Sequence, residues 1–433
     1  MKKRYCLVGL GKIGFNLAIS LNNKGFDFDF WDVDKTKVTN LSCVLKKKPI
    51  KNLKDYLNKK KQTIFLLLIP HHKINIFIES NIKLIKKKDI IIDLGNSNPD
   101  KTYKRHTYLK KFGILFFGVG FSGGVGGASN TPCLMISGKK NDIKKISHIL
   151  AIILNNKKFN VIGEDPRLGH LSKICHNSIE YGLMKLIGEY YILQKKIFKF
   201  SLPKILDNFR KINVKNPNFY LLDLSRKILL DKKELLYNNT ISDKIEHNKT
   251  SKWFNILCLE NEIIYPSLIN ALENRILSKN TKKFYLKKNK IYKDNIYGNY
   301  MDLFSSTFFI CYIQGILALL SICKIKKIKI NLNNLLKVWN KNSIISSNHI
   351  KEIDKNFTRK DINNLRLFSK KKINKINADL INIITLFLKN QENPSELFST
   401  FNWINSHNFS KKDDNVFINL LRNTFGNHKL YKN

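Results

Sequence analysis

Short apolar runs rich in β-branched and aromatic residues alternate with helical stretches in the first part of the chain. These runs predict strands at residues 5–8, 26–31, 63–69, 89–93 and 113–119. The stretches between them carry apolar residues at helical spacing, most clearly at residues 13–24. Alternating strands and helices are typical of a parallel sheet with helices on both faces. The first part is therefore predicted to be a doubly wound α/β domain.

The pattern changes near residue 167, where the strands and glycine-rich loops give way to long helical stretches. These stretches continue to Leu421, with polar loops near 238–252 and 389–396, and no internal repeat is visible. We therefore expect three parts, an α/β domain, a large all-α domain and a short C-terminal tail, at residues 1–166, 167–410 and 411–433.

One helical stretch is long enough to span a bilayer, because no charged residue occurs from Leu303 to Cys323. Six polar side chains interrupt it, and the chain has no second segment of this kind. We therefore predict a helix buried at the centre of the all-α domain, and no membrane partner.

Composition adds a large positive charge. The 433 residues include 77 Lys+Arg and 33 Asp+Glu, a formal net charge of +44, while 43% of residues are hydrophobic. So much apolar surface excludes global disorder. The basic residues are mostly lysines scattered with Asn and Ile, as an AT-rich genome favours, so we do not expect a specific nucleic-acid partner.

The seven cysteines are widely spaced, and no C-x-x-C occurs. This usage is typical of a reducing cytosol and gives no metal-ligand pattern, so we expect a cytoplasmic protein without a metal site. The basic start of the chain leads directly into a glycine-rich turn at Gly9, which leaves no room for the apolar core of a signal peptide.

A dinucleotide-binding fingerprint follows the first predicted strand and opens the first predicted helix. It has the form G-x-G-x-x-G and consists of Gly9, Leu10, Gly11, Lys12, Ile13 and Gly14. Its glycines permit a tight turn, close approach to a pyrophosphate and helix packing, while the helix N-terminus offers amide donors. Asp32 lies about 20 residues on, where an acidic residue meets the ribose. We predict a Rossmann-type NAD(P) site.

The residues after the second predicted strand bear on the choice of cofactor. Asp32 can accept hydrogen bonds from ribose hydroxyls and repels a 2′-phosphate, and Val33 stands where an NADP enzyme would want arginine. Asp34 is the third residue of this turn that we predict to bind the cofactor. This favours NAD, although Lys35 or Lys37 could reach a phosphate, so NADP stays open.

A polar stripe lies on an otherwise apolar helix. Lys173, His176, Asn177 and Glu180 stand at i, i+3, i+4 and i+7, so they share one helical face. Burying ionisable groups is costly and shifts their pKa values toward those that proton transfer needs. The stripe indicates catalysis, and the alternative is a solvated face with a Lys–Glu pair.

A second cluster follows the last two predicted strands. Residues 93–97 (Asp-Leu-Gly-Asn-Ser) close the fourth strand, and the glycine-rich residues 118–128 close the fifth. Ligands of parallel sheets lie beyond the carboxyl ends of the strands. Glycines there leave space for a flat ring to approach, and the hydroxyl and backbone amide of Ser122 can donate hydrogen bonds to a carboxylate. Turn formation alone is the competing interpretation.

These motifs together resemble 6-phosphogluconate dehydrogenase, the decarboxylating enzyme of the pentose phosphate pathway, from Tyr5 to His428. The most specific matches are residues 90–97, 120–124, 173–182 and 422–428, in this order. The resemblance implies that Lys173 is the general base for oxidation at carbon 3 and that Glu180 later protonates carbon 1. It also implies substrate contacts around the carboxylate and hydroxyls from Asn96, Ser122, Gly123, Gly124, His176 and Asn177, and a cofactor contact from Asn96.

For the substrate phosphate, the resemblance implies Tyr181, Arg275, Arg422 and His428. The last two come from the partner subunit in that family, so a homodimer is implied. A lysine and a glycine usually precede Thr250, but Asn248 and Lys249 stand here, and Lys249 is a candidate substitute. Asp32-Val33-Asp34 replaces the usual Asn-Arg-Thr of the family's common NADP preference. The chain also ends five residues after His428, short of the family's longer tail, so a less stable dimer is expected.

Two alternatives compete with this identification. Other β-hydroxyacid dehydrogenases share the fingerprint, the glycine loop and the lysine, but they are generally shorter and lack the Arg422/His428 ending. A basic nucleic-acid-binding protein on the same scaffold would bind with strong salt dependence and would not need Lys173. The complete set of acid, base and phosphate ligands favours the enzyme.

Overall fold

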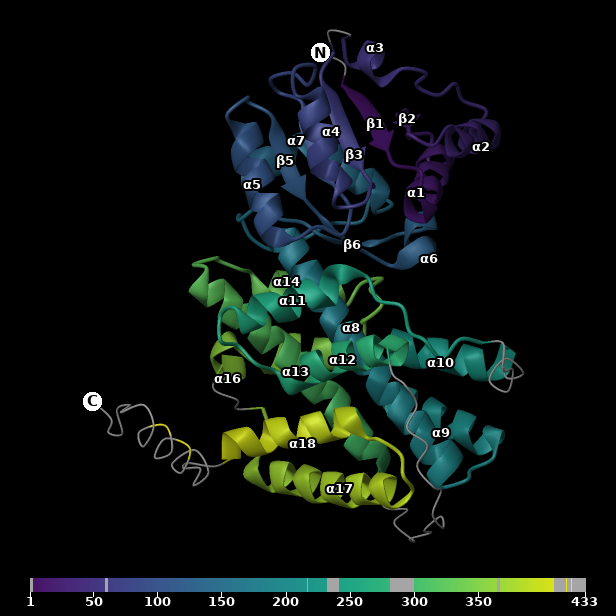
Figure 1. Cartoon of the computed structure of the whole chain (residues 1–433), viewed down its shortest axis with the longest axis vertical. Coiled ribbons are helices and arrows are strands. Elements are labelled where there is room, and N and C mark those ends of the chain that lie inside the picture. Colours follow the sequence, from purple (N-terminus) through teal and green to yellow (C-terminus); the bar gives the residue numbers. More distant parts are fainter. Residues whose placement is uncertain are drawn as a thin grey trace.

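The computed structural model describes residues 3–58, 61–215, 217–231, 241–280, 300–363 and 367–408, together with Ile418 and Arg422. Figure 1 shows an N-terminal α/β part above a helical part, with α8 running from one into the other. The α/β and all-α classes predicted from the hydrophobic pattern are confirmed.

The α/β part contains a five-stranded parallel sheet in the order β2-β1-β3-β4-β5. All five predicted strands form, although the second begins at Asp29 rather than at Phe26. β3 and β4 have every residue buried, as strands covered on both faces require. The strands are β1 (Arg4–Val8), β2 (Asp29–Trp31), β3 (Thr63–Leu67), β4 (Ile90–Asp93) and β5 (Leu115–Gly118).

Helices connect and cover these strands. The apolar faces of α1 and α7 share a buried cluster with β1 residue Leu7, whereas α3 and α4 pack on the opposite face around Phe65. The helices of this part are α1 (Lys12–Asn23), α2 (Lys35–Leu45), α3 (Leu53–Asn58), α4 (Lys73–Asn81), α5 (Pro99–Lys110), α6 (Gly124–Ser129) and α7 (Lys140–Ile153).

A small antiparallel sheet, absent from the prediction, lies between the two parts of the chain. β6 (Gly120–Ser122) pairs with β7 (Cys133–Met135), where residues 120–122 were predicted to be loop. Glycine disfavours strands, so the sequence carries no strand signal there, and burial of all three residues of β6 overrides that preference.

The second part is built from helices joined by irregular segments in its described residues. Its central helices are α8 (Leu168–Ile192) and α13 (Tyr300–Ile325), which pack against each other. Around them lie η1 (Leu193–Ile197), α9 (Leu202–Lys215), α10 (Tyr220–Asp231), α11 (Lys249–Leu259), α12 (Pro266–Asn280), α14 (Leu332–Trp339), α15 (Asn348–Asn356), α16 (Arg359–Asn363), α17 (Lys370–Lys389) and α18 (Ser395–Asn408).

The apolar stretch tested above as a membrane span forms most of α13. Within the described residues, α13 is the one helix with the length and composition of a span, and 83% of its most apolar window is buried inside the protein. It packs against α8 and α17. The prediction of a central buried helix is confirmed.

Three glycines bring the start of α8 against the ends of the strands. A Cβ on Gly169 would lie 2.1 Å from the carbonyl oxygen of Gly118, and one on Gly120 would lie 2.8 Å from Lys173 Cβ. Only glycine permits so close an approach. The packing therefore places Lys173 directly beside the glycine-rich segment that follows β5.

Candidate active site

The glycine fingerprint adopts the geometry of a phosphate-binding loop. Gly9 has φ +98°, and a Cβ on Gly14 would lie 2.0 Å from the carbonyl oxygen of Gly9, so both must be glycine. Gly11 instead faces open space at the N-terminus of α1, with no atom within 4 Å of its virtual Cβ. The first N–H groups of a helix have no partner within the helix, and beside the open Gly11 they can meet a pyrophosphate, so the residues present fit a dinucleotide.

Asp32 is held at the end of β2 by backbone donors. Its Oδ2 accepts the N–H of Leu10 at 2.6 Å, and its Oδ1 accepts the N–H of Asp34 at 2.9 Å. Asp34 caps α2 by accepting the N–H groups of Thr36 and Lys37, so the structure gives it a structural role. Lys37 also forms an ion pair with Asp34 at 3.2 Å.

The polar stripe of α8 is buried, which excludes the solvated-face alternative. Lys173 is 6% exposed, and His176 and Asn177 are buried as well. Burial lowers the pKa of Lys173, against the opposing effect of Glu180. The pKa of Glu180 is raised by burial, although its side chain retains 17% exposure. A lysine that deprotonates easily and a carboxyl that holds its proton suit a base and an acid.

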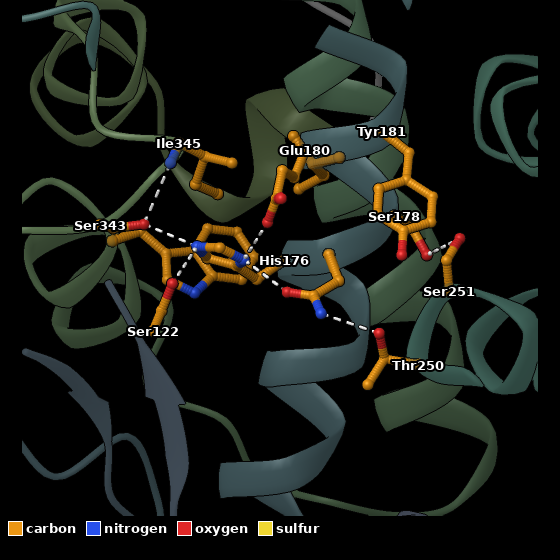
Figure 2. A network of polar contacts seen from close by, with 12 residues as sticks. Ser122, His176, Ser178, Glu180, Tyr181, Thr250, Ser251, Ser343 and Ile345 are labelled. Atoms are coloured by element: carbon orange, nitrogen blue, oxygen red, sulfur yellow. Dashed lines mark hydrogen bonds and ion pairs between the residues drawn. The ribbon is translucent and has the colours of Figure 1, made fainter. Parts of the chain in front are cut away.

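His176 lies at the centre of a hydrogen-bond network (Figure 2). Its Nε2 is 2.6 Å from Ser343 Oγ and 3.2 Å from Ser122 Oγ. On the other side of the ring, Nδ1 is 3.1 Å from Asn177 Oδ1 and 3.8 Å from Glu180 Oε2. Ser343 was missed in the sequence analysis, because it lies 167 residues away and no motif surrounds it.

The network continues from α8 to the start of α11. Asn177 Nδ2 donates to Thr250 Oγ1 at 2.8 Å, and the Thr250 hydroxyl donates to Asn248 Oδ1. Asn248 caps α11 by accepting the N–H of Thr250, and it also accepts the hydroxyl of Tyr181 at 3.3 Å. Asn248, which replaces the family's usual lysine, thus joins two predicted site residues.

The predicted phosphate ligands Tyr181 and Arg275 lie together. The Arg275 guanidinium is 3.5 Å from the centroid of the Tyr181 ring, a cation–π contact. Arg275 Nη1 donates to the backbone oxygen of Glu246. Lys249 is exposed at the first turn of α11, next to the capping residue Asn248. Its side chain is open to an anion from solvent.

The second predicted cluster brings exposed and buried groups to the same sheet edge. Asn96 is exposed after β4, and Gly124 is exposed at the start of α6. Ser122 is buried, and Gly123, at φ +119°, is the N-cap residue of α6. Beneath them lies a buried ion pair that the sequence analysis missed, between Arg105 Nη1 and Asp93 Oδ2 at 3.7 Å. It anchors the turn that carries Asn96.

The predicted tail residues are only partly described. Arg422 is helical and exposed in its own chain, whereas His428 lies outside the described residues. Among the described residues, no group of three or more His, Cys, Asp or Glu side chains has the arrangement of a metal site.

A dinucleotide-binding sheet joined to a helical part that presents a buried lysine and carboxyl defines an NAD(P)-dependent dehydrogenase. The family model "NAD binding domain of 6-phosphogluconate dehydrogenase" matches residues 4–163, and that of "6-phosphogluconate dehydrogenase, C-terminal domain" matches residues 169–433. The chain belongs to the 6-phosphogluconate dehydrogenase family.

Relatives span most of the chain. The "6-phosphogluconate dehydrogenase, decarboxylating" of Buchnera aphidicola is 26% identical over 98% of this chain and 95% of its own length. That of Schizosaccharomyces pombe is 31% identical over 82% of this chain and 77% of its own length. The match to the NAD(+)-dependent enzyme of Bacillus subtilis, at 30% identity, spans 63% of this chain and 60% of that enzyme.

Solved structures agree on the fold. Plasmodium falciparum 6-phosphogluconate dehydrogenase, studied in its apo form and in complexes with NADP+ and 6-phosphogluconate, superposes with a TM-score of 0.86. Its identity is 24%, and 99% of this chain and 98% of that chain are covered. A Mycobacterium tuberculosis 3-hydroxyisobutyrate dehydrogenase covers 64% of this chain at 14% identity, with a TM-score of 0.51, which is a likeness of fold alone.

Proposed function

We propose that the chain catalyses the oxidative decarboxylation of 6-phosphogluconate to ribulose 5-phosphate and CO2, a step of the pentose phosphate pathway, with reduction of NAD or NADP. The observation that carries the proposal is the placement of Lys173 and Glu180 on the buried face of α8, beside the carboxyl ends of the parallel strands. Family membership supports the substrate, and the burial of both groups, with the pKa shifts that it causes, is consistent with a base and an acid.

Lys173 takes the proton of the 3-hydroxyl. Burial lowers its pKa, so the neutral amine that accepts a proton is more accessible than in a free lysine. A dinucleotide held by its pyrophosphate at the glycine fingerprint would supply the nicotinamide ring as the acceptor of the hydride from carbon 3. Lys173, now protonated, lies 6% exposed in a low-dielectric site, where its charge stabilises the oxygen that becomes negative as CO2 leaves.

Glu180 returns a proton to carbon 1. Because burial raises its pKa, the carboxyl holds a proton until the developing carbanion takes it. Loss of CO2 needs no Lewis acid in this scheme, since the ketone at carbon 3 accepts the electron pair. Glu180 lies 3.8 Å from His176, so the acid and the hydroxyl-binding face of the site are contiguous.

Most of the remaining predicted residues bind the substrate in this proposal. Ser122 and the backbone of the following glycines meet the carboxylate. Asn177 meets a hydroxyl, and His176, whose ring nitrogens face Asn177 and Ser343, lies behind this face of the site. The phosphate lies against Tyr181 and Arg275, with Lys249 on the adjacent turn. Charge-assisted hydrogen bonds to a phosphate are about twice as strong as neutral ones. The +44 charge of the chain attracts this anion over longer range without requiring a nucleic acid.

The site is completed by a second copy of the chain, which supplies Arg422 and His428. An apolar stripe supports this homodimer, because Tyr220, Leu224 and Ile228 are exposed at i, i+4 and i+8 on α10. An isologous contact would cover this stripe on both copies. We also retain the division at residues 166 and 410 and a cytoplasmic location as predictions.

We further propose NAD as the preferred cofactor. Asp32 lies at the end of β2 with its carboxylate facing the fingerprint, and Val33 is 80% exposed where a phosphate-binding arginine would stand. An anionic 2′-phosphate would meet a carboxylate and an apolar side chain there.

Turnover of 6-phosphogluconate tests the proposed function. The purified chain should reduce NAD or NADP and release CO2 and ribulose 5-phosphate in equal amounts. Gluconate, which lacks the phosphate, is the matched control and should show a much higher KM. Failure to form ribulose 5-phosphate with either cofactor would overturn the proposal.

A further inference from the structure

The donors and acceptors around His176 determine which of its nitrogens carries the proton. The side chain of Asn248 accepts the backbone N–H of Thr250. A backbone N–H can only donate, so the atom that faces it is the amide oxygen. The Thr250 hydroxyl contacts this same oxygen and must therefore donate its single proton to it.

The orientation of Asn177 follows. Since the Thr250 proton is already used, Thr250 Oγ1 accepts from Asn177, and the group 2.8 Å away is the NH2 of the amide. Asn177 Oδ1 then faces His176 Nδ1 at 3.1 Å. An amide oxygen only accepts, so Nδ1 carries a proton.

The opposite nitrogen is then an acceptor. Burial, with the neighbouring Lys173, lowers the pKa of His176 well below its ordinary value, so the ring is neutral and Nε2 holds a lone pair. Ser343 Oγ lies 2.6 Å from it. The N–H of Ile345 donates to the same Ser343 oxygen at 3.2 Å, which leaves the hydroxyl proton for His176. Figure 2 shows Ser343 and Ser122 on this side of the ring.

Ser343 and Ser122 compete for one lone pair. Ser122 Oγ is 3.2 Å from Nε2, farther than Ser343, and a single in-plane lone pair aligns well with one donor. With Ser343 in place, the Ser122 hydroxyl is available to another acceptor. In the proposed function, that acceptor is the substrate carboxylate.

We propose that Ser343 is a positioning residue, whose hydroxyl takes the Nε2 lone pair of His176 and thereby leaves the Ser122 hydroxyl free for the substrate. This inference rests on the proposed function for the identity of the substrate, but the tautomer itself does not. Ser343 comes from the segment between α14 and α15, so the helical part sets the hydrogen bonding of a strand residue at the glycine loop.

A cavity beside Ser343 makes a conservative variant feasible. It has a volume of about 620 Å³, and its lining includes Gly123, Ser343 and Ser346. The methyl group of a Ser343→Thr variant can point into this space while the hydroxyl stays near Nε2. Ser346 lines the same cavity from the same segment, whereas the described side-chain hydrogen bonds of His176 go to Ser122, Asn177 and Ser343. Ser346→Ala is therefore the matched control.

The first experiment reads the tautomer directly. The full chain is labelled with ¹⁵N-histidine, and the His176 signals are assigned among the ten histidines by their loss in a His176→Asn variant. We expect a protonated Nδ1 and an unprotonated Nε2 in the wild type without substrate. A protonated Nε2 would overturn the proposal, whatever the activity, and this measurement needs no variant of Ser343.

The second experiment separates positioning from stability. Ser343→Ala should raise KM for 6-phosphogluconate about tenfold, the loss expected for one buried hydrogen bond, with kcat within about twofold. Its ¹⁵N spectrum should still show a protonated Nδ1, because Asn177 Oδ1 still faces that nitrogen, and Ser343→Thr should restore KM. An unchanged KM in Ser343→Ala would contradict the proposal. Absence of turnover in the wild type with the expected tautomer would instead remove the proposed function.

Discussion

Asp32 Oδ2 accepts the backbone N–H of Leu10 at 2.6 Å, so the end of β2 is tied to the glycine fingerprint that follows β1. The same carboxylate orders its own turn through the N–H of Asp34. Each oxygen keeps a second acceptor site. One side chain therefore shapes the cofactor loop and remains able to accept a ribose hydroxyl.

Replacing Asp32 should change the cofactor preference. Asp32→Ala removes the ribose acceptor and the repulsion of a 2′-phosphate, so we expect KM for NAD to rise about tenfold or more. Adding Val33→Arg should favour NADP, since a guanidinium binds phosphate through two hydrogen bonds. The measurement is kcat/KM for both cofactors. Asp27→Ala, an exposed acid before the same strand, is the control and should leave the ratio unchanged.

Lys173→Met should nearly abolish chemistry and leave cofactor binding intact. The variant removes the base while keeping an unbranched side chain of similar length, so kcat should fall by about 10²–10⁴-fold. Fluorescence titration with reduced cofactor checks binding. Lys204→Met, on the exposed side of α9, is the matched control. Near-normal kcat in Lys173→Met would remove Lys173 from the role of base.

The dependence of kcat/KM on pH should also report the protonation of Lys173. Only the neutral amine of Lys173 accepts a proton, so kcat/KM should fall as pH drops through its pKa. Because burial lowers that pKa, the fall should occur below the range in which an ordinary lysine titrates. Initial rates across a pH series test this, and a profile that fell only near the ordinary lysine range would contradict it.

Particular residues show how far the sequence could lead. The spacing of Lys173, His176, Asn177 and Glu180 defined one face of a helix, because helical periodicity is local. The fingerprint glycines could also be predicted from the sequence. The positive φ of Gly9 and the close packing of Gly14 on Gly9 both arise within a few residues of each other. Local chemistry with a fixed spacing is accessible without a structure.

Ser343 and the pair Asp93–Arg105 show what the sequence could not provide. Ser343 reaches His176 through a fold that brings together residues 167 positions apart, and a serine between two helices carries no distinguishing pattern. In the sequence, Arg105 cannot be told apart from the many other basic residues. Only the structure shows that it is buried against Asp93. Tertiary contact decides the role of both.

A buried carboxyl away from the active site should limit stability at neutral pH. Glu396 is fully buried at the start of α18, near Glu189, and burial raises its pKa well above the ordinary value. Its Oε1 has no hydrogen-bond partner among the described residues. The unfolded chain loses this proton at lower pH than the folded chain does. Stability contributed by the protonated form is therefore present at low pH and lost as pH rises through the folded pKa.

Glu396→Gln removes this titration while keeping the oxygen that accepts from Asn270. We expect Tm at pH 8 to rise by about 2–4 °C, the effect of about 1 kcal/mol in a large domain. The gain should shrink toward pH 4, where glutamate is protonated in both states. Thermal melts across this range test the sign, with exposed Glu260→Gln as the control. A variant that lost stability at pH 8 would show that Glu396 is ionised in the fold.

Complementation between two inactive variants tests whether active sites are shared between copies. Arg422→Ala should impair phosphate binding in the partner's site, and Lys173→Met should abolish chemistry in its own. A purified heterodimer of one of each, isolated by two affinity tags, contains one intact site and one site with both defects. We therefore expect it to recover about half of the wild-type kcat per dimer. Arg422 is exposed in its own chain, as a residue committed to a partner would be. A heterodimer as inactive as its parents would show that the partner does not supply Arg422.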